Sequence, residues 1–244
     1  MKYPIYFVSD NHFLNQDNDY EKTRRDLFFS LLDHIKSTNG TLIICGDFFD
    51  FWYDYKNYVP DNYKNIFDAL EDLKNAGIKI YYILGNHDYW DSGYFTKKFG
   101  AKIIKNNLVL DMDGQKTLIT HGDGALKKEW FYRLFRTFIR SKFIVDSFGI
   151  IPPKMGYYLT SIISKTEKHA KQKRGNSIYL VNQLSKVGKE KWDIGFDNVV
   201  MGHYHQTGIF KHNNKRVIFL GDWVNKFMVT IYDSGRWKQV KWGE

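Results

Sequence analysis

The fold is decided by the stretch Ile83-Leu84-Gly85-Asn86-His87-Asp88. It follows residues 78–82, whose β-branched and aromatic side chains are typical of a buried strand. Glycine permits a sharp turn at position 85, so the chain leaves this strand and at once presents an amide, an imidazole and a carboxylate. Such a turn could be an ordinary strand end, and its meaning depends on what the other predicted strands carry.

On either side of this stretch, apolar runs predict further strands, and helical spacing predicts helices at about residues 20–36 and 61–76. The predicted strands cover residues 4–8, 41–45, 107–110, 116–120, 198–201, 216–220 and 227–232. In the first half of the chain, strands and helices alternate. This pattern predicts an α/β fold in which helices pack on a layered sheet.

Polar clusters end five of these predicted strands, and together they indicate a metal site. They supply Asp10 and His12, Asp47, Asn86 and His87, His121, and His203 and His205. Imidazole, carboxylate and amide donors without thiolate suit manganese, iron, zinc or magnesium. A single buried histidine is usually only hydrogen-bonded, but five clusters at strand ends favour metal ligands over that interpretation.

The composition excludes several classes of protein. The 244 residues are 43% hydrophobic, which excludes a disordered chain. No apolar run approaches the roughly 20 residues of a membrane-spanning helix. A strand-like run begins within a few residues of Met1, so we expect no secretory signal. Cys45 is the single cysteine, which excludes an intrachain disulfide and is consistent with a reducing cytosol.

The positive charge is concentrated in one segment. Residues 127–192 hold 15 Lys or Arg against 4 Asp or Glu, a local charge of +11, whereas the whole chain carries +9. Their pattern is helical, with a break at Pro152-Pro153, and strands follow from residue 198. We therefore predict a main domain of residues 1–126 and 193–244, with residues 127–192 inserted as a basic helical cap that meets an anionic partner.

The cap is predicted to contain amphipathic helices. One apolar stripe at helical spacing consists of Trp130, Phe131, Leu134, Phe135, Phe138 and Ile139, and off it lie Arg133, Arg136 and Arg140. A second run from about residue 155 to 173 adds Tyr157, Leu159 and Ile162, then Lys165, Lys168, Lys171 and Arg174. Such helices suit acyl chains and anionic headgroups. Alternatively, the stripe packs on the main domain and the charges form a solvated face.

The motif set resembles that of the calcineurin-like metallophosphoesterases. The matching motifs are Asp10-x-His12, Gly46-Asp47, Gly85-Asn86-His87-Asp88, His121 and Gly202-His203-x-His205. The resemblance implies a four-layer α-β-β-α sandwich with two divalent metal ions, manganese foremost. By motif, the first ion has the ligands Asp10, His12, Asp47 and His205, and Asp47 bridges to the second, which Asn86, His121 and His203 complete. It also implies that His87 lies near the phosphate, where it stabilises charge or protonates the leaving group, and that Asp88 orients it.

Three further motifs resemble the UDP-2,3-diacylglucosamine pyrophosphatases within that family. They are Gly46-Asp47-Phe48-Phe49-Asp50-Phe51-Trp52, His121-Gly122-Asp123 and Leu220-Gly221-Asp222-Trp223, with the basic insertion at the position of a lipid-binding cap. The resemblance implies cleavage of UDP-2,3-diacylglucosamine to lipid X and UMP by a cytoplasmic protein at the inner face of the cell membrane. Substrate contacts are then expected at Asn86, His87, Asp123, Glu129, Lys171 and Arg174.

Two other functions stay open from the sequence. The chain departs from the best-known branch of those pyrophosphatases, which has Arg where this chain has His87. A phosphodiesterase or nuclease could use the basic insertion to bind a polynucleotide backbone, with steep salt dependence. A membrane-surface binding module could keep the metals only for structure, and hydrolysis would then be absent.

Overall fold

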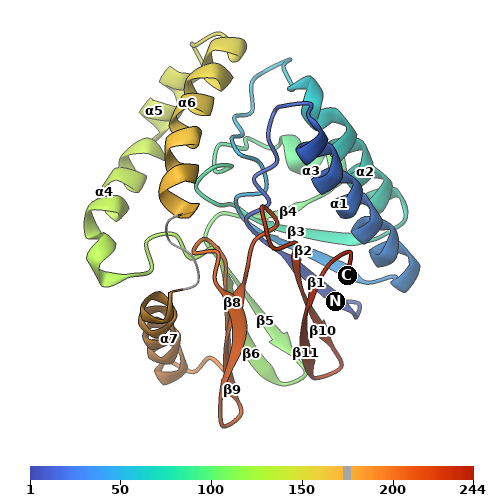
Figure 1. Ribbon diagram of the computed structural model, residues 1–244, viewed down its shortest axis with the longest axis vertical. Helices are drawn as coiled ribbons and strands as arrows, with labels where there is room; N and C mark the ends of the chain where they lie inside the picture. The colour runs from blue at the N-terminus through green and yellow to red at the C-terminus, as the bar shows by residue number, and fades with distance from the viewer. Residues whose placement is uncertain (173–176) are drawn as a thin grey trace.

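The structure is a computed structural model that describes residues 1–172 and 177–244. Within helix α6 (Pro153–Gln172) it describes the side chains as far as Ile162, and that of Ser164. Two mixed β-sheets form the centre of the molecule (Figure 1). The first has the order β11-β10-β1-β2-β3-β4 and contains β1 (Ile5–Val8), β2 (Thr41–Cys45), β3 (Lys79–Ile83), β4 (Lys102–Ile104), β10 (Met228–Asp233) and β11 (Arg236–Lys241). The second has the order β5-β6-β7-β9-β8 and contains β5 (Asn107–Met112), β6 (Gln115–Thr120), β7 (Asn198–Met201), β8 (Thr207–His212) and β9 (Lys215–Leu220).

Apolar side chains from both sheets fill the space between them. The fully buried residues at this interface include Ile5, Phe7 and Ile43 from the first sheet and Ile119, Val200 and Ile218 from the second. Because side chains alternate along a strand, Tyr6 and Val8 of β1 point to the opposite face of the first sheet. The central strands are therefore apolar on both faces, as strands covered on both sides must be.

Three helices cover the outer face of the first sheet. They are α1 (Asp19–Thr38), α2 (Lys64–Asn75), which follows the 3₁₀ turn η1 (Asp61–Tyr63), and α3 (Tyr94–Phe99). Helix α1 begins where the Asn18 side chain accepts a hydrogen bond from the backbone N–H of Glu21. It ends at Asn39, which adopts the left-handed conformation. These caps match the predicted start and stop of this helix to within two residues.

A fourth layer lies on the outer face of the second sheet. Helix α7 (Ile178–Asp193) buries Leu184 and Trp192 against Val199 and other residues of that sheet. At Gly188 the helix approaches so closely that an added Cβ would lie 2.4 Å from the Val217 side chain. The order helix, sheet, sheet, helix confirms the predicted four-layer α-β-β-α sandwich.

The segment between β6 and β7 is helical, as predicted. It contains η2 (Lys127–Glu129), α4 (Trp130–Ile139), α5 (Lys142–Phe148), α6 (Pro153–Gln172) and α7. Helices α4, α5 and α6 stand together at the upper left of Figure 1, apart from α7. Phe148 of α5 packs on the rings of Phe51 and Tyr53, and Tyr157 of α6 packs on the ring of Phe51. The division into a main domain and a cap of residues 127–192 stays a prediction, and α7 belongs to the fourth layer.

Candidate metal centre

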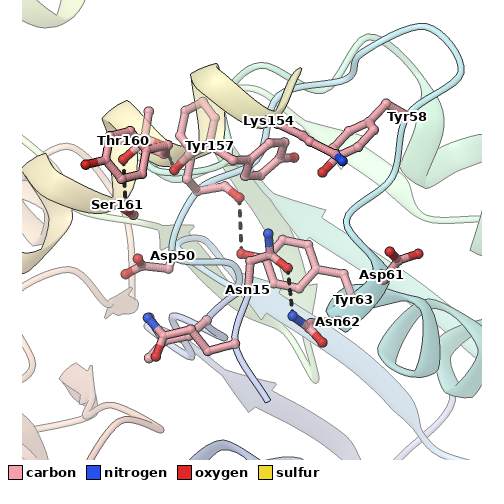
Figure 2. Close-up of a pocket in the computed structure, with 14 residues that line it drawn as sticks. Asn15, Asp50, Tyr58, Asp61, Asn62, Tyr63, Lys154, Tyr157, Thr160 and Ser161 are labelled. Atoms are coloured by element: carbon pink, nitrogen blue, oxygen red, sulfur yellow. Dashed lines mark hydrogen bonds between the residues drawn. The ribbon is translucent and has the colours of Figure 1, made fainter. Parts of the chain in front are cut away.

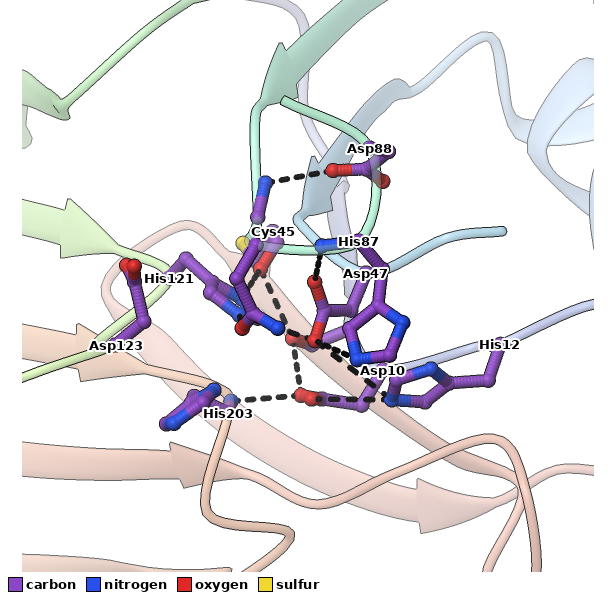
Figure 3. A network of polar contacts seen from close by, with 12 residues as sticks. Asp10, His12, Cys45, Asp47, His87, Asp88, His121, Asp123 and His203 are labelled. Carbon is purple, nitrogen blue, oxygen red and sulfur yellow. Dashed lines mark hydrogen bonds and ion pairs between the residues drawn. The ribbon is translucent and has the colours of Figure 1, made fainter. Parts of the chain in front are cut away.

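The five predicted clusters all follow strands directly and meet at one place (Figure 3). Those after β1, β2 and β3 come from parallel neighbours of the first sheet, so their carboxyl ends share one edge. Those after β6 and β7 come from parallel neighbours of the second sheet. Three groups have ligand atoms within 4.8 Å of one another: Asp10, His12 and His205; His12, Asp47 and His87; Asp47, His121 and His203. With Asn86, these residues are here called the cluster.

Asp47 lies at the middle of the cluster. Its Oδ2 atom is 3.3 Å from Nε2 of His121 and 3.7 Å from Nε2 of His12. The Oδ1 atom of Asp10 lies 3.4 Å from Nε2 of His205 and 3.8 Å from Nε2 of His12. Asn86, in the loop after β3, belongs to the same group, since its Oδ1 atom is 3.3 Å from Nε2 of His121. The structure therefore brings together all seven residues predicted as metal ligands.

Two fully buried carboxylates set the electrostatics of the cluster. Burial raises the pKa of Asp10 above its ordinary value. Burial acts in the same direction on Asp47, but the imidazoles of His121 and His87 outweigh it and hold the pKa of Asp47 well below its usual range. Burial lowers the pKa of His121, and Asp47 more than reverses this, raising it to about 10. The buried carboxylates thus favour positive charge at this site, and a bound cation would supply it.

The donor atoms fit divalent metal ions. Among the described residues, the buried atoms Oδ1 of Asp10 and Nε2 of His205 make no hydrogen bond. Buried polar atoms without a hydrogen bond are uncommon in folded proteins and call for an explanation. A cation bound by both would provide one, and carboxylate oxygen with imidazole nitrogen is a donor set that such cations accept.

The backbone of the cluster is held in an uncommon conformation. Five of the predicted ligands have φ between 44° and 64°, in the left-handed region: Asp10, His12, Asp47, His203 and His205. Residues other than glycine adopt this conformation at a cost of about 1–3 kcal/mol each, and it gathers at functional sites. Five such residues around one centre therefore support a ligand-binding role. The sequence carries no signal for them beyond the residue types.

Polar contacts around the cluster orient the predicted ligands. The hydroxyl of Ser9 donates to Oδ2 of Asp10 at 2.6 Å, and Nδ1 of His121 lies 2.8 Å from the carbonyl oxygen of Cys45. Nδ1 of His205 lies 3.6 Å from a carboxylate oxygen of Asp222. Such partners fix the ring orientation of metal-binding histidines. Ser9 and the Cys45 carbonyl were not predicted, because their role depends on strands that only the fold makes adjacent.

Position 85 requires glycine because the loop after β3 lies directly against Asp47. A Cβ atom at this position would lie 2.2 Å from Oδ1 of Asp47 and 2.4 Å from its backbone nitrogen. The absence of a side chain lets the loop after β3 press against the carboxylate, and the backbone N–H of His87 donates to Oδ1 of Asp47 at 2.9 Å. Gly85 is therefore needed for this contact as well as for the turn.

His87 and Asp88 have different partners. Nδ1 of His87 lies 2.6 Å from the carbonyl oxygen of Asp50, and Nε2 lies 4.0 Å from Oδ2 of Asp47. Asp88 is fully buried and accepts hydrogen bonds from the N–H of Gly85, the N–H of Phe48 and the hydroxyl of Tyr82. Asp88 thus holds the shape of the loop after β3, and its catalytic role stays a prediction.

The predicted substrate contacts beyond the cluster are held by the protein itself. Asp123 pairs with Arg136 of α4 at 2.9 Å and with Arg140, the residue that caps the C-terminus of α4, at 3.1 Å. Glu129 accepts hydrogen bonds from the Tyr204 hydroxyl at 2.6 Å and the backbone N–H of Leu126. The side chain of Lys171 and the whole of Arg174 lie outside the described residues.

Arg140 is a site residue that the sequence did not identify. Its Nη2 atom donates to the carbonyl oxygen of Gly85 at 3.1 Å as well as to Asp123. Its guanidinium lies 3.9 Å from the ring centroid of Tyr89. Arg140 therefore ties helix α4 to the loop that carries Asn86 and His87.

Comparison with known proteins identifies the family. Residues 3–207 match the model of the calcineurin-like phosphoesterases, so the chain belongs to this family of hydrolases, which implies divalent metal ions at the cluster. Three relatives named UDP-2,3-diacylglucosamine hydrolase come from Porphyromonas gingivalis (25% identical, 96% of this chain and 95% of the relative), Neisseria meningitidis (28%, 95% and 95%) and Aliivibrio fischeri (30%, 94% and 95%). These findings confirm the resemblance and disfavour a binding module without hydrolase activity.

Proposed function

We propose that this hydrolase cleaves the pyrophosphate of UDP-2,3-diacylglucosamine into 2,3-diacylglucosamine 1-phosphate and UMP. Relatives that cover nearly the whole chain carry the name of that activity. The observation that carries the proposal is that α4, whose apolar side chains are exposed, contacts the buried cluster: the ring centroid of Tyr132 on α4 lies 6.3 Å from that of His203. A metal site that cleaves phosphoesters and an apolar surface for acyl chains thus occur together.

The cluster would hold two divalent ions, and manganese is the metal that we propose for both. Asp10, His12, Asp47 and His205 would bind the first, and Asp47, Asn86, His121 and His203 the second. Such ions supply positive charge that stabilises phosphoryl oxygens and acidifies water at neutral pH. The fully buried carboxylates of Asp10 and Asp47 support this assignment, because buried charges need compensation.

His87 would act as the general acid. The Asp50 carbonyl accepts from Nδ1, so the ring presents Nε2 toward Asp47 at the middle of the cluster, as Figure 3 shows. In the imidazolium form Nε2–H can protonate the phosphate oxygen that leaves when the P–O bond breaks, while water adds to phosphorus. Histidine is the side chain that enzymes use most often for such a proton transfer.

Helix α4 supports a lipid substrate. Trp130, Phe131 and Phe138 are 60%, 68% and 60% exposed, so the stripe does not pack on the main domain, contrary to the alternative drawn from the sequence. The arginines face the protein, where Arg133 donates to the carbonyl oxygens of Gly124 and Leu126. The polar face of α4 thus fixes the helix, and the apolar face stays available for acyl chains.

The same apolar face supports a location at the membrane. Among the described residues, no helix has the length and apolar character needed to cross a bilayer. We propose that the protein is cytoplasmic and associates peripherally with the anionic inner face of the cell membrane through α4. An amphipathic helix with exposed aromatic residues can insert into the interface without spanning it.

One comparison of substrates tests the proposal. The purified protein with manganese is assayed on UDP-2,3-diacylglucosamine, bis-p-nitrophenyl phosphate and single-stranded DNA. Hydrolysis of the lipid far above the other two supports the proposal. Equal or faster cleavage of DNA, inhibited by salt in the way of polynucleotide binding, would instead assign the alternative nuclease activity.

A further inference from the structure

A pocket of about 410 Å³ lies beside the cluster, between α6 and the loops that follow β1 and β2 (Figure 2). Amides line it at Asn15, Gln16 and Asn62, and tyrosine side chains line it at positions 58, 63, 157 and 158. This volume falls within the usual range for small-molecule sites. None of the residues predicted to bind metal lines the pocket.

Asp50 connects the pocket to the cluster. It lines the pocket, its carbonyl oxygen lies 2.6 Å from Nδ1 of His87, and its Oδ1 atom lies 4.0 Å from Nδ1 of His12. The hydroxyl of Ser164 on α6 donates to the same carboxylate at 2.7 Å. Asp50 thus contacts both His12 and His87 of the cluster and lines the pocket, so the pocket adjoins the cluster at this residue.

The lining determines which group fits. An acyl chain would cover amides and carboxylates without giving them hydrogen bonds, at a cost of about 1–3 kcal/mol each. A nucleobase offers a flat ring for aromatic contact and an edge of donors and acceptors. Asn62 donates to Asn15 at 3.2 Å, and the two amides have more donors and acceptors than this bond uses.

We propose that this pocket is the nucleoside subsite, which receives the uridine of the substrate while the acyl chains lie along α4. The inference rests on the proposed function, because it takes the nucleotide from that substrate. The substrate would then extend in two directions from the cluster, with its polar end held under α6 and its apolar end outside.

Binding of UMP and of ribose 5-phosphate to the metal-loaded protein, measured by isothermal titration calorimetry, tests the subsite. Both ligands carry the phosphate, so the ratio of their Kd values reports the base alone. We expect UMP to bind at least about tenfold more tightly, the effect of one or two hydrogen bonds with aromatic contact. Equal Kd values in the wild-type protein would overturn the proposal.

Paired variants test whether the preference for UMP over ribose 5-phosphate arises in this pocket. Asn62→Leu should remove the advantage of UMP, whereas Asn65→Leu, an exposed position on α2 outside the pocket, should keep it. Ser161→Phe, which narrows the pocket from α6, should also remove it. Unchanged binding of ribose 5-phosphate shows that each variant is folded and keeps its cluster. An advantage of UMP that survives both pocket variants would overturn the proposal.

The outcome is independent of the lipid assay. If the wild-type protein fails to hydrolyse UDP-2,3-diacylglucosamine, the proposed function fails, and the ratio of UMP to ribose 5-phosphate binding still decides whether the pocket takes a nucleoside. If hydrolysis occurs and the ratio is one, the substrate stands and the subsite does not.

Discussion

Nδ1 of His87 lies 2.6 Å from the backbone carbonyl oxygen of Asp50. A carbonyl oxygen only accepts hydrogen bonds, so Nδ1 carries the hydrogen and the tautomer of the neutral ring is fixed. His87→Ala removes the proton donor but none of the predicted metal ligands. We expect kcat to fall about 10²- to 10⁴-fold while the metal content per chain, measured by plasma mass spectrometry, stays unchanged.

His87→Gln is the companion variant, because it keeps polarity near the Asp50 carbonyl but cannot transfer a proton at neutral pH. It should lose as much turnover as His87→Ala. Activity close to wild type in either variant would remove His87 from the chemistry.

Gly85→Ala should disable metal binding. The added methyl group would meet Asp47 within 2.4 Å at two atoms, and the carboxylate or the loop must move. We expect the manganese Kd, measured by titration of the chelator-treated protein, to rise about 10- to 100-fold, as it does when groups that position metal ligands are disturbed. A Kd equal to wild type would show that the loop yields without moving Asp47.

Metal removal should lower thermal stability. Ions that bind the folded protein alone stabilise it by about 2.7 kcal/mol at 100 times their Kd. For a chain of this size that corresponds to a Tm difference of about 5–10 °C between chelated and manganese-loaded protein, measured by differential scanning calorimetry. His203→Ala should reduce this Tm difference. If the variant shows the same Tm difference as the wild-type protein, His203 is not a ligand.

Phe131 and Phe135 on α4 should control attachment to lipid surfaces. The double variant Phe131→Ser/Phe135→Ser loses two exposed aromatic rings, each worth about 1.5–3 kcal/mol when buried in lipid. We expect binding to phosphatidylglycerol vesicles, measured by cosedimentation, to fall at least tenfold, with hydrolysis of bis-p-nitrophenyl phosphate unchanged.

The matched control for that variant is Phe210→Ser, which removes an exposed aromatic ring from β8 on the second sheet. It should leave vesicle binding unaffected. A loss of equal size in the control would indicate that the protein binds lipid nonspecifically and not through α4.

The central strands were predictable because they are apolar on both faces. The predicted strands at residues 41–45 and 198–201 coincide with β2 and β7. Three strands were missed, β4, β8 and β11, and each lies at a sheet edge. In β11 (Arg236–Lys241) charged residues lie between partly buried ones. Such charges keep an edge strand from pairing with another chain, but they also interrupt the apolar run by which a strand is predicted.

The ligand types of the cluster were predictable, and the way they are held was not. Residue type and position after a strand identified Asp10, Asp47 and His121. The left-handed backbone at Asp10 and the hydrogen bond between His121 and the Cys45 carbonyl arise from packing between segments far apart in the sequence. Arg136 and Arg140 illustrate the same limit, because only the fold shows that they pair with Asp123.

The cluster draws its side chains from the ends of both sheets, with Asp47 on one side and His121 and His203 on the other. Cation release and separation of the two sheets at this end are then coupled: each makes the other easier. Amide hydrogens near the ends of β2 and β7 should accordingly exchange faster in chelated protein, while those at the opposite end of the same strands keep their protection. The bound ions would in that case also hold the two sheets together at this end of the molecule.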